Sequence, residues 1–248
     1  MLTSIDFANW PILLLGALAV FTGSLTQAST GLGLGMVAAP ILLLIDPRLV
    51  PGPLLVLAFV VSLLIALREW RSIDRKGLSF ALVGRVPGSV LAGLTISLVP
   101  LATYNLLFGL LVLGAVLLSA TGWRVLPTPR NLLTAGFTSG YMGTLTSIGA
   151  PPLALAYQHG TASSMRATMA AYFVIGSAVS IAVLAMFGRF AVEQVLASAI
   201  FLPPLVAGFW ASGHIVARMN NRLARQAVLW LSGLSAAMLI IKSLLITG

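Results

Sequence analysis

The sequence contains no cysteine and few charged residues, five acidic and fourteen basic among 248. Without cysteine, the chain has no disulfide framework, no thiol catalysis and no thiolate metal site. A charged fraction of 8% beside 59% hydrophobic residues cannot cover a water-facing surface, since soluble domains carry about 25% charged residues. The composition therefore excludes a soluble globular or disordered protein and predicts an all-α polytopic membrane protein.

The shortage of acidic residues gives a net charge of +9, which has a simple explanation in a membrane protein. Basic residues collect in cytoplasmic loops and set the orientation of the chain. Lysines and arginines are not interleaved with stacking aromatics, so we expect no nucleic-acid partner. The sequence has no Walker A motif, which excludes ATP hydrolysis by this chain. We expect neither a metal site nor a cofactor.

Hydrophobic segments fill most of the chain. Ten apolar stretches are separable, at residues 8–28, 33–46, 50–68, 77–98, 102–121, 131–147, 150–158, 167–187, 191–214 and 224–246. Because no lysine or arginine precedes Arg48, the first stretch lacks the basic region of a signal peptide and is interpreted as a retained membrane segment. Stretches 33–46 and 150–158 are too short to span easily and are typical of re-entrant segments.

The two halves of the sequence repeat one order of features. The run from Gly31 to Pro40 precedes a similar run from Gly143 to Pro152 by 112 positions. This predicts a first repeat at 1–121, a linker at 122–130 and a second repeat at 131–248, within one membrane domain. In each repeat we expect a re-entrant hairpin broken by glycine and proline, followed by three transmembrane helices. Each repeat ends opposite to where it began, so the second is inverted.

The positions of the basic residues predict the orientation. With the N-terminus outside the cytoplasm, ten basic residues fall inside and three outside, which agrees with the positive-inside rule. The ten are Arg68, Arg71, Arg75, Lys76, Arg124, Arg130, Arg166, Arg218, Arg222 and Arg225, and the three are Arg48, Arg189 and Lys242. Both termini are therefore predicted to lie outside the cytoplasm.

Glycine-rich breaks at matching places in the two halves are the main functional signal. One interpretation is close helix packing through small residues. The other is a broken helix, because glycine frees the backbone, Pro40 removes a donor, and exposed backbone at membrane depth is tolerated only beside a cavity. Two breaks in inverted halves are typical of a transporter site near the midplane.

Polar residues gather around both breaks, where hydroxyls, an amide and free backbone N–H groups suit an oxyanion. Such hydroxyls can instead bond the carbonyl of the preceding turn. Arg85 is the basic residue inside a span, where it either attracts an anion or extends to the interface; no carboxylate is predicted at mid-span to pair with it. The candidate substrate-binding residues are Gln27, Ser29, Thr30, Gly31, Gly33, Arg85, Gly143, Thr144, Ser147 and Gly149.

With these features the chain resembles the TauE/SafE family of sulfite exporters, also called toluene-sulfonate uptake permeases. The resemblance lies in the glycine run ending in Pro40, the second run from Gly140 to Leu153, the basic loop 68–76 and the overall size. It implies a multi-pass permease of the bacterial inner membrane, without enzymatic activity, for sulfite, sulfoacetate or another organosulfonate. Its partners would be the small sulfur-containing anion and the lipid bilayer, with a homo-oligomer possible.

Two other functions compete with transport. An intramembrane serine hydrolase would use Ser139 or Ser147 as nucleophile and His159 or His214 as base, but neither histidine is predicted at mid-span. A non-transporting membrane assembly factor would need no polar clusters at both breaks. Transport by alternating access is the function that the sequence favours.

Overall fold

The computed structural model describes residues 10–120, 125–158 and 160–215, together with residues 230, 233, 234 and 237. These residues form α-helices joined by short turns and 3-10 segments, with no β-strand in the described part. Five helices are long and apolar enough to cross a membrane, or six if a bent pair counts as one span. The prediction of an all-α polytopic membrane protein is confirmed.

The helices follow the predicted apolar stretches closely. They are α1 (Trp10–Thr30), α2 (Leu34–Ile45), α3 (Gly52–Glu69), α4 (Arg75–Leu98), α5 (Leu101–Ala120), α6 (Pro129–Thr146), α7 (Ala150–Tyr157), α8 (Ala162–Met186), α9 (Val192–Ala199) and α10 (Leu202–Ile215). The 3-10 segments η2 (Pro47–Leu49) and η3 (Trp70–Ser72) flank α3. The predicted stretch 191–214 is two helices, α9 and α10, bent by 55°. Most of the predicted stretch 224–246 lies outside the described residues.

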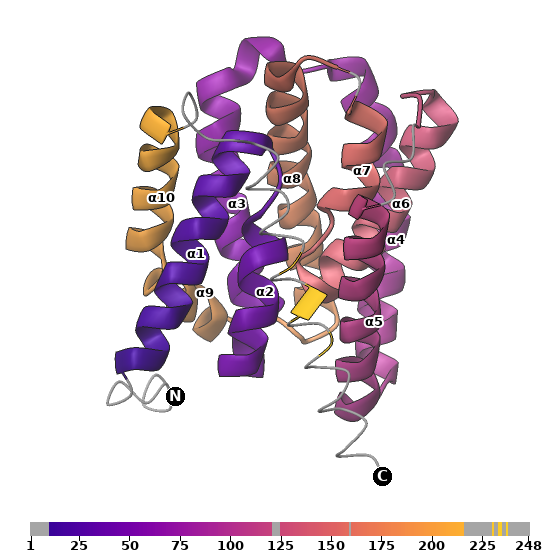
Figure 1. The fold of residues 1–248 in the computed structure, drawn as a ribbon. Helices are drawn as coiled ribbons and strands as arrows, with labels where there is room; N and C mark the ends of the chain where they lie inside the picture. Colours follow the sequence, from indigo (N-terminus) through magenta and orange to yellow (C-terminus); the bar gives the residue numbers. More distant parts are fainter. Residues whose placement is uncertain are drawn as a thin grey trace.

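Two pairs of helices fold back as hairpins. In Figure 1, α1 rises from the lower end and α2 returns toward it, whereas α6 descends from the upper end and α7 returns upward. At 1.5 Å per residue, α2 and α7 are about 18 and 12 Å long, much less than the roughly 30 Å of a bilayer core. Neither short helix is long enough to cross a bilayer core by itself, and re-entry of the two hairpins stays a prediction. That the two hairpins belong to inverted repeats remains a prediction.

Left-handed backbone explains where each hairpin breaks. Gly31 and Gly33 have φ of +85° and +148°, values that a residue with a β-carbon rarely adopts, so α1 ends here. Ser147, with φ of +61°, ends α6, and its N–H bonds the carbonyl of Gly143 at 2.9 Å. Pro40 was expected to contribute to the first break, but it lies inside α2. The glycines alone therefore make that break.

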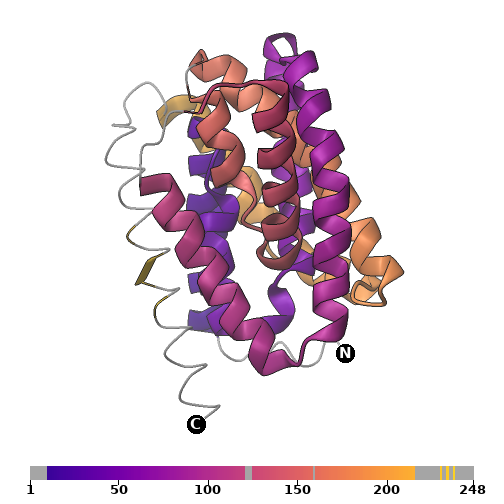
Figure 2. The same cartoon turned by 90° about the vertical axis from the view of Figure 1, so that its right-hand side faces the viewer.

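Glycines also bring α4 and α6 into backbone contact. A β-carbon on Gly84 or Gly88 would overlap carbonyl groups of α6, and one on Gly136 or Gly140 would overlap carbonyl groups of α4. Each helix thus presents a G-x-x-x-G pair, the spacing that permits close approach of membrane helices. Figure 2 shows α5 crossing at a tilt beside this group of helices.

The hydrophobic core has two clusters that meet at the breaks. One consists mainly of side chains of α1, α2, α3 and α5, together with Met142, Ala170, Phe201 and Leu205, and the other of side chains of α4, α6, α7 and α8. Leu32, in the first break, packs against the second cluster, and Ile148, in the second break, belongs to the first cluster. Each break thus contributes one apolar side chain to the cluster that is formed mainly by the other group of helices.

The two ends of the bundle differ in charge. The α3–α4 connection and the starts of α6 and α8 share the upper end in Figure 1, which we call the basic end. This end carries Arg68, Arg71, Arg75, Lys76, Arg130 and Arg166. The opposite end carries Arg48 in η2 and Arg189 after α8.

Candidate functional site at the crossing of two broken helices

The two breaks meet inside the bundle. A small void between them is lined by Gln27, Gly33 and Gly35 from the first hairpin and by Ser147 and Gly149 from the second. Its volume is about 20 Å³, which has room for about one water molecule. The structure therefore brings the two tips together, and in this conformation they are closed on each other.

Gln27 holds the first break in shape. Its amide oxygen accepts a hydrogen bond from the backbone N–H of Leu34, at 3.2 Å, and its amide nitrogen donates to Ser62 Oγ of α3, at 3.0 Å. Leu34 is the first residue of α2, so Gln27 satisfies one of the orphan donors of that helix start. The side chain is 6% exposed, which makes these bonds costly to lose.

Hydroxyl groups hold the second break in shape. Ser139 Oγ donates to the carbonyl of Gly149, and Ser147 Oγ donates to the carbonyl of Pro51 at 3.1 Å. Tyr104 Oη donates to the carbonyl of Leu145 at 2.7 Å. Of these three carbonyls, that of Leu145 is freed by the end of α6, and a side chain meets it, as backbone at membrane depth requires.

The Arg85 side chain is buried next to the second break and does not extend to the membrane–water interface. It is 2% exposed, Nη2 donates to Ser180 Oγ at 3.0 Å, and the guanidinium lies 5.0 Å from the ring centre of Tyr172. Nε and Nη1 have no hydrogen-bond partner within the described part of the chain, and no described carboxylate pairs with this cation. A buried cation in this state is costly and is typical of a functional site.

Gly143 connects Arg85 with the breaks. A β-carbon on Gly143 would lie 3.3 Å from Gly149 Cα and 3.6 Å from Arg85 Nη1. Thr144 points to the same side, where its hydroxyl and that of Ser180 are 2.7 Å apart. The candidate residues thus form two adjoining groups, one between the tips and one around Arg85.

Three of the candidate residues lie away from both groups. Ser29 and Thr30 bond carbonyls of their own helix, those of Leu25 and Thr26, as the alternative for membrane hydroxyls predicts. The Thr30 hydroxyl also accepts from the N–H of Leu32, at 3.2 Å, and lies 2.9 Å from its carbonyl oxygen, within the first break. Gly31 faces α8, where a β-carbon would lie 3.2 Å from Arg166 Cα. These residues shape the first break but do not line the void between the tips.

A cavity of about 610 Å³ leads toward the breaks from the end opposite the basic end. Two arginines, Arg48 and Arg189, and two carboxylates, Asp46 and Glu193, line it among mostly apolar side chains. Its wall includes Pro51 and Tyr104, the residues that bond Ser147 and Leu145. The cavity therefore lies one layer of residues away from the second break, with no residue of that break in its lining.

The described residues that a serine hydrolase would use make other hydrogen bonds and do not contact one another as nucleophile and base. Ser139 and Ser147 donate to backbone carbonyls, and His214 lies exposed, 3.4 Å from the carbonyl of Trp210. His159 lies outside the described residues. Among the residues that the structure describes, no three His, Asp or Glu side chains cluster as a metal site would require.

A comparison with known families decides the assignment. The sulfite exporter TauE/SafE family matches residues 15–239, nearly the whole chain. The chain belongs to the TauE/SafE family. Neither curated proteins nor solved structures gave a match. As a TauE/SafE protein, the chain is a membrane transporter of the sulfite exporter type, and the resemblance inferred from the sequence is confirmed.

Several residues around the TauE/SafE site were missed by the sequence analysis. Gly176 and Ser180 of α8 surround the guanidinium of Arg85, and a β-carbon on Gly176 would overlap it. Their small-x-x-x-small spacing in α8 is typical of a helix face that another group approaches closely, and this spacing could have indicated them. Ser62 carried no signal, because a lone serine in an apolar helix is unremarkable in sequence.

Proposed function

We propose that this TauE/SafE protein moves a small sulfur-containing oxyanion, such as sulfite, sulfoacetate or another organosulfonate, across a bacterial inner membrane. Transport proceeds by alternating access around an anion site at the crossing of the two breaks. The single observation that carries this proposal is Arg85, a buried cation next to the second break whose Nε and Nη1 have no hydrogen-bond partner among the described residues. A positive charge without a carboxylate partner favours an anion over a cation.

The closed tips explain how the site would work. A void of about 20 Å³ is too small for an oxyanion, so the breaks must separate for the anion to enter. Separation exposes Ser147, the Gln27 amide and the backbone N–H groups around Gly149, which are suitable donors to an oxyanion. Gly143 contributes no side chain between the second break and the guanidinium of Arg85, whose Nη1 would lie 3.6 Å from a β-carbon there.

The basic end faces the cytoplasm in this proposal. Six basic residues of the described part lie there against two at the opposite end, which agrees with the positive-inside rule. α1 begins at the opposite end, so the N-terminus would lie outside the cytoplasm. An anion that leaves a cell with a negative interior gains about 2.3 kcal/mol per charge per 100 mV, so export needs no proton relay.

Transport is tested with the purified protein in liposomes loaded with sulfite, sulfoacetate or a carboxylate of similar size. We expect sulfur oxyanions to leave protein-containing vesicles faster than empty ones, and a positive-outside potential to accelerate them. The same anions should raise the melting temperature of the detergent-solubilised protein. If no sulfur oxyanion moves or stabilises the protein while a carboxylate does, the proposed substrate class is wrong.

A further inference from the structure

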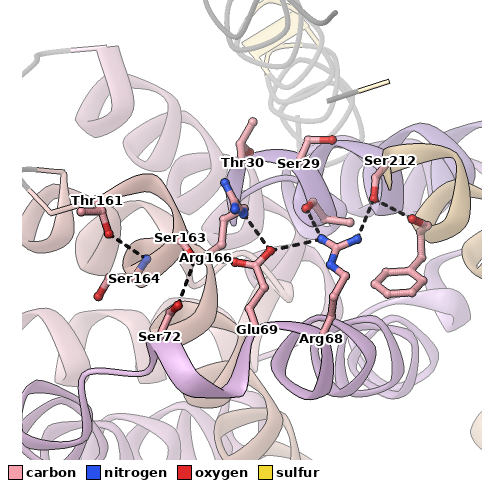
Figure 3. A network of polar contacts seen from close by, with 12 residues as sticks. Ser29, Thr30, Arg68, Glu69, Ser72, Thr161, Ser163, Ser164, Arg166 and Ser212 are labelled. Carbon is pink, nitrogen blue, oxygen red and sulfur yellow. Dashed lines mark hydrogen bonds and ion pairs between the residues drawn. The ribbon is translucent and has the colours of Figure 1, made fainter. Parts of the chain in front are cut away.

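A group of polar side chains closes the basic end directly above the first break. Glu69, at the end of α3, accepts hydrogen bonds from Arg166 Nε of α8 at 3.1 Å and from Arg68 Nη2 at 3.4 Å (Figure 3). Ser163 of α8 donates to Glu69 at 3.4 Å and to Ser72 Oγ at 3.0 Å. We call these five residues the polar clamp.

Arg68 extends the polar clamp to two more helices. Its Nη2 donates to the carbonyl of Ala28 in α1 at 2.8 Å, and its Nη1 donates to Ser212 Oγ of α10 at 3.2 Å. The guanidinium also lies 4.8 Å from the ring centre of Phe209. The end of α3 is thereby tied to α1, α8 and α10 at one level of the bundle.

The polar clamp lies against the first break. Arg166 Cα would be 3.2 Å from a β-carbon on Gly31, so the start of α8 rests on the left-handed residue that ends α1. The Glu69 side chain is only 13% exposed, which shields its ion pair from water. At the other end, by contrast, a cavity of about 610 Å³ extends as far as Pro51 and Tyr104, which bond Ser147 and Leu145 at the second break.

We infer that the polar clamp is the gate at the basic end, closed in this structure, and that it must open before the breaks connect with that end. The inference rests on the proposed function, because only a transporter needs alternating closure. Glu69 acts here as a mechanical link between α3 and α8 and not as a proton carrier. Opening the gate would separate α8 from the first break and, by alternating access, close the cavity at the opposite end.

The absence of cysteine provides a direct test. Leu32, between the two left-handed glycines, and Ala197, in the cavity wall, are each replaced by a single cysteine. Labelling with a hydrophilic thiol reagent is then followed on the full-length protein in detergent, where both ends are accessible. In the parent we expect Ala197→Cys to react quickly and Leu32→Cys slowly.

Glu69→Gln should shift both rates, in opposite directions. Loss of the shielded ion pair should raise labelling of Leu32→Cys about tenfold, a shift equivalent to about 1.4 kcal/mol, and slow labelling of Ala197→Cys. Arg166→Gln should act alike, and the double variant should add little, because both changes break one bond. Arg71→Gln is the matched control, since Arg71 belongs to the same end but stacks on Trp70 outside the polar clamp.

The outcomes separate a gate from a structural contact. Opposite shifts in the two rates support the inference. Unchanged labelling rates overturn it, and so do labelling rates that rise together, because these indicate loosening of the whole fold. An equal effect of Arg71→Gln would also overturn it. Because labelling requires no substrate, its failure leaves the transport assay in liposomes as an independent test of the proposed function.

Discussion

Gly35 and Ser147 touch through their backbones, although they belong to different hairpins and lie far apart in sequence. A β-carbon on Gly35 would overlap the carbonyl oxygen of Ser147, closer than real β-carbons approach another atom. The first residues of α2 and the left-handed end of α6 are therefore pressed together with no side chain between them. In the proposed transport cycle, opening of the breaks would separate this contact.

Gly35→Ala should impair transport at this contact. The added methyl group must push the tips apart, which we expect to reduce the transport rate at least tenfold and to cost about 1–3 kcal/mol of stability. Gly114→Ala is the control, because a β-carbon there meets nothing within 4 Å. Transport in liposomes and melting temperature are measured for both variants. Wild-type transport by Gly35→Ala would show that the tips need not meet.

Gln27→Ala should weaken anion binding through the first break. The change removes both the acceptor for Leu34 N–H and the donor to Ser62. Hydrogen bonds to a charged ligand are worth about 1.5–3 kcal/mol, so affinity should fall roughly tenfold or more. Ser62→Ala removes only the second bond and should have a smaller effect. Affinity is measured as ligand-induced thermal stabilisation. If both variants lose the same affinity, Gln27 acts through its hydrogen bond to Ser62 of α3 and not through direct contact with the anion.

Arg85→Met should separate function from stability. Methionine keeps much of the volume but removes a buried cation whose Nε and Nη1 lack partners in the part of the chain that the structure describes, so the melting temperature should stay unchanged or rise. Transport of a sulfur oxyanion should be abolished. Thr144→Val, which removes a hydroxyl beside Ser180 and keeps the cation, should retain more activity. A strongly lowered melting temperature in Arg85→Met would indicate a structural role for Arg85.

The turn after α2 should respond to pH. Partial burial raises the pKa of Asp46, but hydrogen bonds from the Arg48 side chain and backbone, and its charge, bring the pKa below the usual value. A lowered pKa stabilises the fold above the ordinary pKa of an aspartate, and this contribution disappears as the pH falls through the folded-state value. Asp46→Asn should therefore lower the melting temperature at neutral pH, and the difference should vanish in acid. A difference that persists in acid would contradict this linkage.

The sequence predicted the parts of the fold that depend on apolar composition, which marks the helices, and on glycine, which marks the breaks. Nine of the ten apolar stretches correspond to described helices, and both breaks occur at the glycine runs. The bend between α9 and α10 was missed because it occurs inside one continuous apolar stretch. There, Pro203 and Pro204 occupy the first turn of α10, where proline is tolerated and leaves little signal.

The candidate site was predicted only in outline. Gln27, Ser147 and Gly149 line the void, because residues next to a break share its location, and their binding of a substrate stays a prediction. Ser29 and Thr30 also adjoin a break but do not line the void. The Ser29 hydroxyl bonds its own helix and the Thr30 hydroxyl bonds both its own helix and Leu32, and such directions at a disrupted helix end cannot be read from sequence. The polar clamp joins residues about a hundred positions apart, a pairing that depends on tertiary packing.

The double G-x-x-x-G contact between α4 and α6 has a mechanical consequence. Two helices in backbone contact along several turns cannot slide or tilt without breaking many small contacts at once, so they behave as one rigid strut. In the proposed cycle, the motion that alternates access between the two sides of the membrane must then occur in helices other than this pair. Spin labels on the outer faces of α4 and α6 should keep a constant separation throughout the transport cycle. The movements of the other helices can then be measured relative to this fixed pair.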